Sequence, residues 1–202
     1  MYTVDHEGFL PPNHSTGSGR IWDNTGPSCL LGNAFQDATP NNLQNGLLFH
    51  YNSSIGIYKC PSDRSTVLDE GKIRRWWSFS LSGSMNYEWD SERNSLDGYG
   101  KVWTKQSSIT LPGASQAFTF ADDHEYSIQD AVFGVNVPGW QPFGQPLCSW
   151  IDFPATRHGQ AGSLAFADGH AEIWKWIESN TAEQAKRPPQ FSPPRQRPMI
   201  AT

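Results

Sequence analysis

Two histidines and an aspartate stand close together in residues 157–170, and these residue types carry out acid–base or metal chemistry. His158 precedes Asp168, and His170 follows directly after the next residue, Gly169. A histidine and an aspartate that share a proton need direct contact, at about 2.6–3.2 Å. Chemistry by this pair therefore depends on whether the chain between His158 and Asp168 lets the two side chains meet.

The chain between them has the pattern of a β-hairpin. Short apolar runs flank Asp168-Gly169, and an Asp-Gly pair in that setting is the strongest short-range hairpin signal. We expect both residues to be the centre of a type I′ turn, where each needs a positive φ. A strand over 163–167 would span roughly 16 Å and place His158 and Asp168 at opposite ends. The pattern thus favours structural roles, with Asp168 in the turn and His158 fixing the loop at the base.

The two-residue turn also predicts which face of the hairpin is buried. Phe166 would face Ala171, and Leu164 would face Ile173. One face would then belong to the core: Leu164, Phe166, Ala171 and Ile173. The other would be half-exposed: Ala165, Ala167, His170, Glu172 and Trp174.

A metal site is the functional alternative at this hairpin. His170 would act with ligands from elsewhere, and the best candidates are Asp122, Asp123 and His124. A metal-dependent hydrolase would draw on a wider set, although no HExxH or similar motif is present: Asp122, Asp123, His124, His158, Asp168 and His170. Calcium is the one cofactor that the acidic stretches suggest, at 122–123 or 90–97, and neither stretch resembles an EF-hand loop.

Composition indicates a loop-rich, β-rich or α+β protein. The chain has 202 residues, enough for one domain with a buried core, and only 17% are charged, while Gly (18) and Pro (15) are abundant. A net charge of −5 argues against nucleic-acid binding as the main role. No apolar stretch approaches the roughly 18–20 residues that cross a bilayer, and the N-terminus lacks the features of a signal peptide. We therefore expect a soluble chain that is either cytosolic or separated from an upstream targeting segment.

The chain divides into a main domain, 1–185, and a Pro-rich basic tail, 186–202, with no core of its own. Alternating large and small residues predict a strand within 76–87, and a second strand is expected over 117–121. The three cysteines, Cys29, Cys60 and Cys148, have no C-x-x-C spacing, which argues against a zinc knuckle or a thioredoxin-like motif. One disulfide and one free thiol would be compatible with an exported chain, and the sequence does not determine which two cysteines would pair.

Four segments in this order resemble the bacterial pseudopilin-like proteins of planctomycete type that carry a prepilin-type, processing-associated H-X9-DG domain. His158, nine intervening residues and Asp168-Gly169 match the signature. Residues 58–63, with Cys60, Pro61 and Asp63, resemble its Cys-Pro-Ser-Asp motif. Residues 2–12 resemble the stretch after its N-terminal helix, and residues 82–87 its Ser-Tyr-Gly-Met-Asn segment, with a Gly-Ser pair in place of Tyr-Gly.

The resemblance implies a pilin-like α+β head, in which an antiparallel sheet packs on the end of an N-terminal helix. The stretch that would form that helix and its leader is not seen before residue 2, so we expect a soluble head that is mostly strand and loop, with Met1 either native or an introduced start. It implies a non-enzymatic subunit of a type II secretion or type IV pilus-like filament, with other pilin-like subunits or the secretion apparatus as partners. The full-length precursor would be anchored in the inner membrane, with its head in the periplasm or at the cell surface.

Aromatic residues supply a further alternative. Trp103, Trp140 and Trp150 lie in loop-like sequence and would serve a carbohydrate-binding module if exposed, because aromatic rings stack on sugars. The competing interpretation is that tryptophans fill a core poor in aliphatic residues. Trp76 and Trp77 would point in opposite directions in a strand, so one of them would be exposed.

Overall fold

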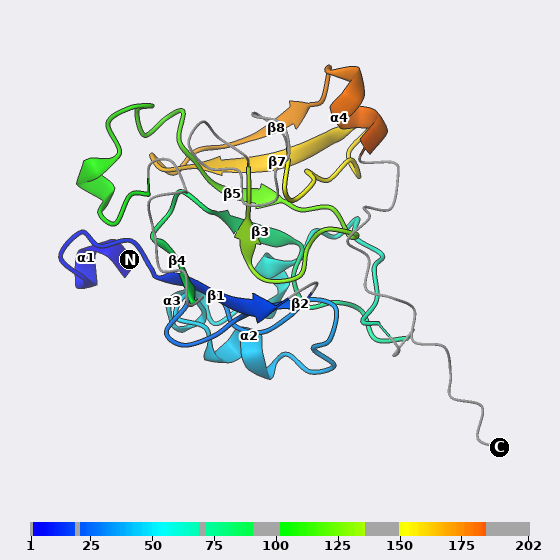
Figure 1. The fold of residues 1–202 in the computed structure, drawn as a ribbon, viewed down its shortest axis with the longest axis horizontal. Coiled ribbons are helices and arrows are strands. Elements are labelled where there is room, and N and C mark those ends of the chain that lie inside the picture. Colours follow the sequence, from blue (N-terminus) through cyan, green and yellow to red (C-terminus); the bar gives the residue numbers. More distant parts are fainter. Residues whose placement is uncertain (1, 19–20, 69–71, 91–101, 136–149, 185–202) are drawn as a thin grey trace.

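The computed structural model describes residues 2–18, 21–68, 72–90, 102–135 and 150–184 (Figure 1). Two sheets carry the fold, one of five strands in the order β6-β3-β5-β7-β8 and one of three in the order β2-β1-β4. The five-stranded sheet comprises β3 (Phe79–Ser82), β5 (Phe118–Asp122), β6 (Val132–Phe133), β7 (Ala161–Phe166) and β8 (Ala171–Lys175). The other comprises β1 (Asn13–Ser18), β2 (Ile21–Asn24) and β4 (Tyr87–Asp90).

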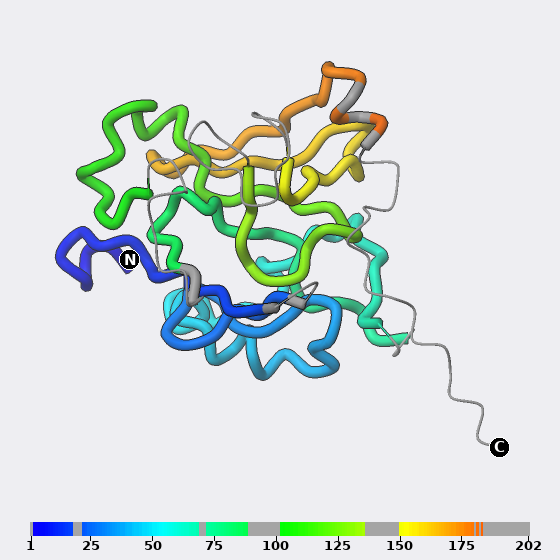
Figure 2. Tube along the Cα trace, viewed as in Figure 1, coloured from blue at the N-terminus to red at the C-terminus, as the bar shows by residue number. Residues whose placement is uncertain are grey.

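Helices are short and lie outside the sheets. They are α1 (Tyr2–Asp5), α2 (Asn41–Asn45), α3 (Phe49–Asn52), the 3-10 turns η1 (Ile55–Tyr58) and η3 (Gln106–Ser108), and α4 (Ser179–Gln184). Figure 2 shows residues 2–18 and 21–60, in blue and cyan, mainly in the lower part of the molecule, while the β7–β8 hairpin, in yellow and orange, lies at the top. The expected α+β, sheet-rich and loop-rich fold is confirmed.

Both sheets contain antiparallel pairs, as expected, and each also contains one parallel pair. β3 pairs with β6, and β1 with β4, in parallel, while the pairs β3–β5, β5–β7 and β7–β8 are antiparallel. Parallel pairing needs a long crossover between the strands, and the connections from β3 to β6 and from β1 to β4 supply it.

Aromatic and small apolar side chains fill the core. Trp77 is fully buried and sits in the larger apolar cluster with Leu81, while the neighbouring Trp76 is partly buried against it. The predicted strand over 76–87 is instead two strands, β3 and β4, separated by a turn. The strand expected over 117–121 is confirmed as β5, shifted by one residue.

The hairpin forms where the sequence predicts it, with a different turn. Phe166 N donates to His170 O at 2.9 Å, and Gly169 N donates to Phe166 O at 3.0 Å, so residues 167–169 form the loop. Gly169 has φ +95°, whereas Asp168 is not among the residues with positive φ. The type I′ prediction is therefore wrong, because the loop holds three residues and only its last one needs the left-handed region.

The extra residue in the loop shifts the register, so each side chain of β8 lies on the opposite face of the sheet from the one predicted. Ser163 now pairs with Ile173 and Leu164 with Glu172, because a one-residue slip in register exchanges the faces of a strand. Leu164 and Phe166 are buried as expected, but Ile173 is 68% exposed and Ala171 is exposed too, so their assignment to the core is wrong. All five residues of β8 are exposed, as suits a strand at the end of the sheet.

The turn makes a testable prediction. Gly169→Ala places a Cβ at φ +95° and should lower the free energy of unfolding by about 1 kcal/mol. Gly113→Ala is the matched control, because its added Cβ meets nothing within 4 Å and its φ lies outside the left-handed region. Urea unfolding of both variants measures the difference, and equal stability of the two would contradict the three-residue turn.

Candidate functional site

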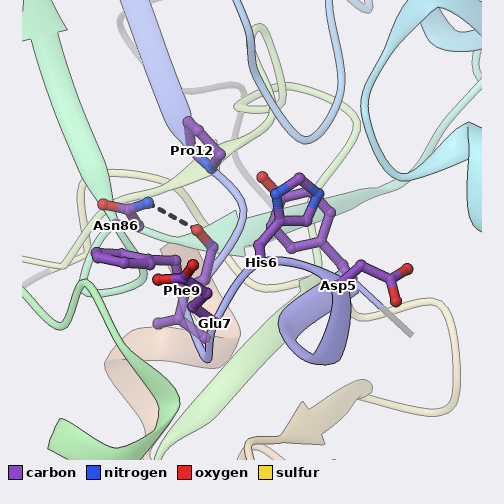
Figure 3. Close-up of a pocket in the computed structure, with 8 residues that line it drawn as sticks. Asp5, His6, Glu7, Phe9, Pro12 and Asn86 are labelled. Carbon is purple, nitrogen blue, oxygen red and sulfur yellow. Dashed lines mark hydrogen bonds between the residues drawn. The ribbon is translucent and has the colours of Figure 1, made fainter.

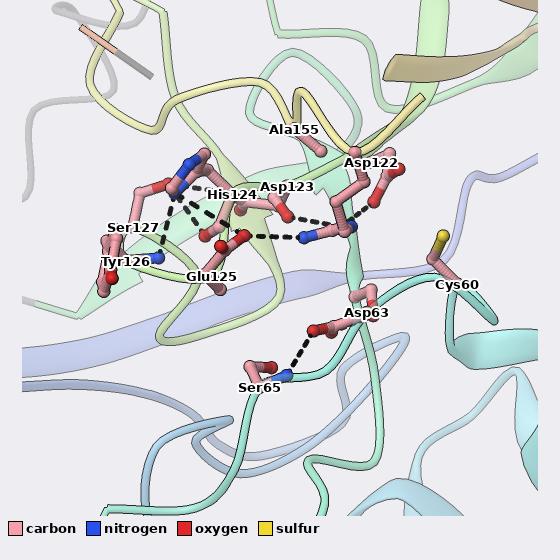
Figure 4. Close-up of polar contacts among 12 residues, drawn as sticks. Cys60, Asp63, Ser65, Asp122, Asp123, His124, Glu125, Tyr126, Ser127 and Ala155 are labelled. Carbon is pink, nitrogen blue, oxygen red and sulfur yellow. Dashed lines mark hydrogen bonds and ion pairs between the residues drawn. The ribbon is translucent and has the colours of Figure 1, made fainter. Parts of the chain in front are cut away.

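The interior holds a buried arginine whose guanidinium joins several segments. The Arg157 side chain is mostly buried, its Nη2 contacts Asp122 Oδ1, and its Nη1 lies 3.1 Å from Glu125 Oε2. Nη2 also donates to the backbone carbonyl of Asp123 at 2.9 Å. Figure 4 shows Asp122, Asp123 and Glu125 around this centre. The planar fork of a guanidinium suits several acceptors at once, so Arg157 ties the end of β5 to the loop before β7.

A second buried carboxylate faces the same centre from another segment. Asp63 accepts hydrogen bonds from Ser78 Oγ at 2.5 Å and from the backbone N–H of Ser65 at 2.8 Å. Burial by itself would raise the pKa of Asp63, but these hydrogen bonds, with the charge of Arg157, bring it below its ordinary value. Asp63 is therefore an anion that fixes the turn after Cys60.

Three side chains with metal-ligand chemistry meet beside this network. Cys60 Sγ lies 3.3 Å from His158 Nε2, and the same Nε2 lies 3.4 Å from Asp122 Oδ2. All three ligand atoms lie within 4.8 Å of one another. Among the residues the structure describes, no other group of three His, Cys, Asp or Glu side chains is this compact.

The arrangement differs from a catalytic Cys–His–Asp triad. In a triad the nucleophile and the carboxylate occupy different nitrogens of the imidazole, so that the ring relays between them. Here Cys60 and Asp122 both address Nε2 of His158. The ring cannot take a proton from the thiol on one nitrogen while the carboxylate orients it through the other.

Solvent access is uneven across the three side chains. Cys60 is buried and Asp122 is 1% exposed, whereas the His158 side chain is 28% exposed. Burial raises the pKa of Asp122, and the charge of Arg157 opposes that rise. Asp122 Oδ1 is held by Arg157, while Asp122 Oδ2 is buried without a hydrogen-bond partner.

Asp123 lies next in the chain and points to a different environment. Ser80 Oγ and Ser127 Oγ lie 2.8 and 2.7 Å from its two carboxyl oxygens. Complete burial raises the pKa of Asp123 to about 8, against the lowering effect of both hydroxyls. This carboxyl group is therefore largely protonated at neutral pH, and its role is to link β3 to the segment around Ser127.

The predicted ligand set of His170, Asp122 and Asp123 is not assembled in the described part of the chain. His170 Nδ1 lies 2.5 Å from Asp168 Oδ1, its Nε2 lies 3.4 Å from Glu172 Oε1, and its ring stacks on Phe166 at 4.4 Å. The hydrogen bonds from His170 lower the pKa of Asp168. The reason is the hairpin geometry: the turn carries His170 outward, away from the end of β5.

The remaining metal candidates are accounted for locally. His124 Nδ1 accepts from the backbone N–H of Tyr126 at 3.2 Å. Asp122 and Asp123 address Arg157 and the two serines, so the pair does not present a shared oxygen cage for calcium. The acidic stretch 90–97, the other calcium candidate, lies almost wholly outside the described residues.

His158 and Asp168 lie at the two ends of the first hairpin arm, as predicted, and each has other partners. His158 does more than hold a loop, because it joins Cys60 and Asp122. The sequence places Cys60, Pro61 and Asp63 in one motif but does not predict that Cys60 meets His158. The one feature of the sequence that could have suggested this contact is that Cys60 and His158 each belong to a motif of the same family.

The three candidate sugar-stacking tryptophans do not form an exposed platform in the described structure. Trp103 is 6% exposed and belongs to the core, so its assignment to a ligand-facing surface is wrong. Trp150 is partly buried against Phe133 and Trp176, and its Nε1 donates to Thr181 Oγ1 at 3.1 Å. Trp140 lies outside the described residues.

Two of the cysteines are free thiols. Cys29 and Cys60 are both buried and unpaired, and Cys148 lies outside the described residues. Burial raises the pKa of the Cys29 thiol to about 12, which keeps it protonated and inert.

A cavity of about 410 Å³ lies elsewhere, beside the N-terminal segment (Figure 3). His6 stacks on Tyr2 at 4.0 Å and contacts Tyr51 through its Nε2 at 3.3 Å. Asn86 Nδ2 donates to the carbonyl of Leu10 at 2.8 Å and closes one side. Among the described residues that line this cavity, His6 and Asn86 therefore bind groups of other segments, and no hydrogen-bonded pair of a nucleophile and a base is seen.

Comparison of the chain with known family models, with curated proteins and with solved structures finds no significant match to any of them. Among the described residues, no helix has the length and apolar character needed to cross a bilayer.

Removing the buried guanidinium should strongly destabilise the fold. Arg157→Ala leaves Asp122 buried without its cation, and such losses cost about 3–5 kcal/mol. Arg64→Ala, at an exposed arginine, should stay within about 0.5 kcal/mol of the parent. Chemical denaturation measures both, and a loss of about 0.5 kcal/mol or less in Arg157→Ala would contradict the central role of this network.

The raised pKa of Asp123 predicts that the free energy of unfolding depends on pH. Between about pH 4 and 8 the folded chain keeps a proton on Asp123 that the unfolded chain releases, so the free energy of unfolding falls as pH rises through this window. Asp123→Asn retains partners for both serines and has no such proton. At pH 8 it should exceed the parent by at least about 1 kcal/mol, the equivalent of one pH unit, and at pH 4 it should match the parent.

Denaturation curves at several pH values measure this effect. Asp168→Asn is the control, because Asp168 is exposed and the pKa of its carboxyl group is shifted downward. An unchanged pH slope in Asp123→Asn would show that Asp123 is ionised in the folded chain.

Proposed function

We propose that this chain is the non-enzymatic head of a pilin-like subunit, which assembles into a type II secretion or type IV pilus-like filament. The observation that carries the proposal is that the four segments resembling the family are joined in two pairs inside the fold. Cys60 of the second segment contacts His158 of the signature at 3.3 Å. Asn86 of the third binds the Leu10 carbonyl of the first at 2.8 Å.

Motif residues used in this way support a structural role. Residues that serve an enzyme converge on a pocket where substrate can enter. Here Asp63 is buried and Asn86 is partly buried, and each binds a group of another segment: Asp63 accepts from Ser78, and Asn86 donates to the Leu10 carbonyl. In the part of the chain that the structure describes, these residues link segments, and Asn86, which borders the cavity, does so through the Leu10 carbonyl.

The N-terminal end of the fold suits attachment to an anchoring helix. α1 lies at the periphery, beside the smaller sheet and far from the β7–β8 hairpin (Figure 1). Val4 in α1 is largely exposed. A preceding apolar helix, which the resemblance implies, would join the head at this edge and hold it in the periplasm or at the cell surface.

The opposite side offers a surface for a neighbouring subunit. β8 is a terminal strand of the five-stranded sheet, and large apolar side chains are exposed on it and just after it: Ile173, Trp174 and Ile177. Edge strands with exposed apolar side chains tend to pair or pack with another chain. We assign this surface, β8 with Ile177, to contacts with another pilin-like subunit.

Two alternatives receive less support. A carbohydrate-binding role loses Trp103 as a stacking surface, since that ring is in the core. A hydrolase drawing on the six candidate residues keeps the contact between His158 and Asp122 but loses His170, which faces Asp168 and Glu172.

Site-specific photo-crosslinking of the full-length gene product in its own cells tests assembly. A benzophenone side chain at Ile173 or Ile177 should give covalent dimers and higher species of pilin-like subunits in the sheared-filament or envelope fraction. Gln36, which is exposed on a different part of the molecule, is the control position and should give few such products. Monomers alone at every position, or a protein confined to the cytosolic fraction, would overturn the proposal.

A further inference from the structure

We propose that Cys60, Asp122 and His158 form a zinc-binding site that joins three segments of the head. Cys60 follows η1, Asp122 ends β5, and His158 lies in the loop that leads into β7. Figure 4 shows Cys60 and Asp122 on separate stretches of chain beside the Asp63 turn. The site shares Asp122 with the set predicted around His170, but Cys60 and His158 take the place of His170 and Asp123.

The distances between the ligand atoms fit a zinc ion. Zinc binds thiolate sulfur at about 2.3 Å and imidazole nitrogen or carboxylate oxygen at about 2.0–2.2 Å, nearly always in a tetrahedron. The edges of such a tetrahedron are about 3.3–3.7 Å long. Cys60 Sγ to His158 Nε2 is 3.3 Å, and His158 Nε2 to Asp122 Oδ2 is 3.4 Å. Two of the three edges therefore match a tetrahedral zinc site, and Cys60 Sγ lies within 4.8 Å of a carboxylate oxygen of Asp122.

An orphaned acceptor points to a missing ligand at the same place. Asp122 Oδ2 is fully buried and accepts no hydrogen bond, although Asp122 Oδ1 is held by Arg157; its 3.4 Å contact with His158 Nε2 is an ion pair only when that imidazole is protonated. A buried acceptor without a partner is costly, and a cation between Asp122 Oδ2 and His158 Nε2 would remove that cost. Arg157 would then orient the ligating carboxylate from behind, as outer-shell partners do in metal sites.

The donor set selects the kind of metal. A thiolate is a poor ligand for calcium or magnesium, whereas sulfur with imidazole and carboxylate suits zinc. The Cys60 thiolate and the Asp122 carboxylate together balance a divalent ion, and Glu125 balances Arg157 nearby. Because the His158 side chain is 28% exposed, a water molecule can reach the ion as a fourth ligand.

The site would act as a cross-link. Its ligands come from segments 98 residues apart in sequence, in the case of Cys60 and His158, and an ion held by both would stabilise the folded chain. At a free zinc concentration about 100-fold above Kd, the melting temperature should rise by about 5–10 °C.

Cobalt and zinc titrations of the purified, chelator-treated chain test the site. One equivalent of Co²⁺ should give a thiolate-to-metal charge-transfer band, and one equivalent of Zn²⁺ should abolish it. Cys60→Ser should lose the band, and His158→Ala should weaken binding at least about 10-fold. Cys29→Ser and His170→Ala are the matched controls, a buried free thiol and a histidine outside the site, and both should bind like the parent.

X-ray absorption at the zinc edge of the parent protein keeps the test decisive if Cys60→Ser fails to fold. The expected spectrum has one sulfur and the remaining scatterers nitrogen or oxygen. Binding that is lost with Cys29→Ser or His170→Ala, a spectrum without sulfur, or no binding at equimolar zinc would each overturn the proposal.

Discussion

The contact between the guanidinium of Arg157 and the carboxylate of Asp122 is the constraint on which the rest of the interior depends. Both groups are removed from water, so each needs the other to offset the cost of burial. The contact fixes the end of β5 against the loop before β7. His158 follows Arg157 directly, so fixing one positions the other beside Cys60. Asp63 adds a further negative charge from the turn after Cys60, and the network thereby spans three distant parts of the chain.

The signature His-X9-Asp-Gly divides into two ends with separate tasks. Its histidine faces the interior and contacts Cys60 and Asp122. Its glycine takes the left-handed conformation in the loop, and its aspartate contacts the exposed His170. β7 lies between these ends and carries Leu164 and Phe166 into the core. The fixed spacing follows from the length of one hairpin arm, and no contact between its own His and Asp is needed.

Local sequence patterns predict the hairpin, β5 and the loop-rich α+β class, because a turn, or a strand with alternating large and small side chains, depends on only a few neighbouring residues. The turn type was wrong because two- and three-residue loops share the Asp-Gly signal, and that single residue decided the facing of Ile173. The contact between Cys60 and His158 could not be predicted from the sequence, because it depends on the order of strands in the sheet. Trp103 was misplaced for the same reason, since sequence around it resembles a loop while the fold surrounds it with core residues.

Anomalous diffraction from crystals of the zinc-loaded protein, recorded above and below the zinc edge, tests the meeting of Cys60, Asp122 and His158 most directly. The account predicts an anomalous peak within bonding distance of Cys60 Sγ, Asp122 Oδ2 and His158 Nε2, with Arg157 behind the carboxylate. A structure in which His158 turns away from Cys60, or in which the ion is bound at His170 instead, would contradict it.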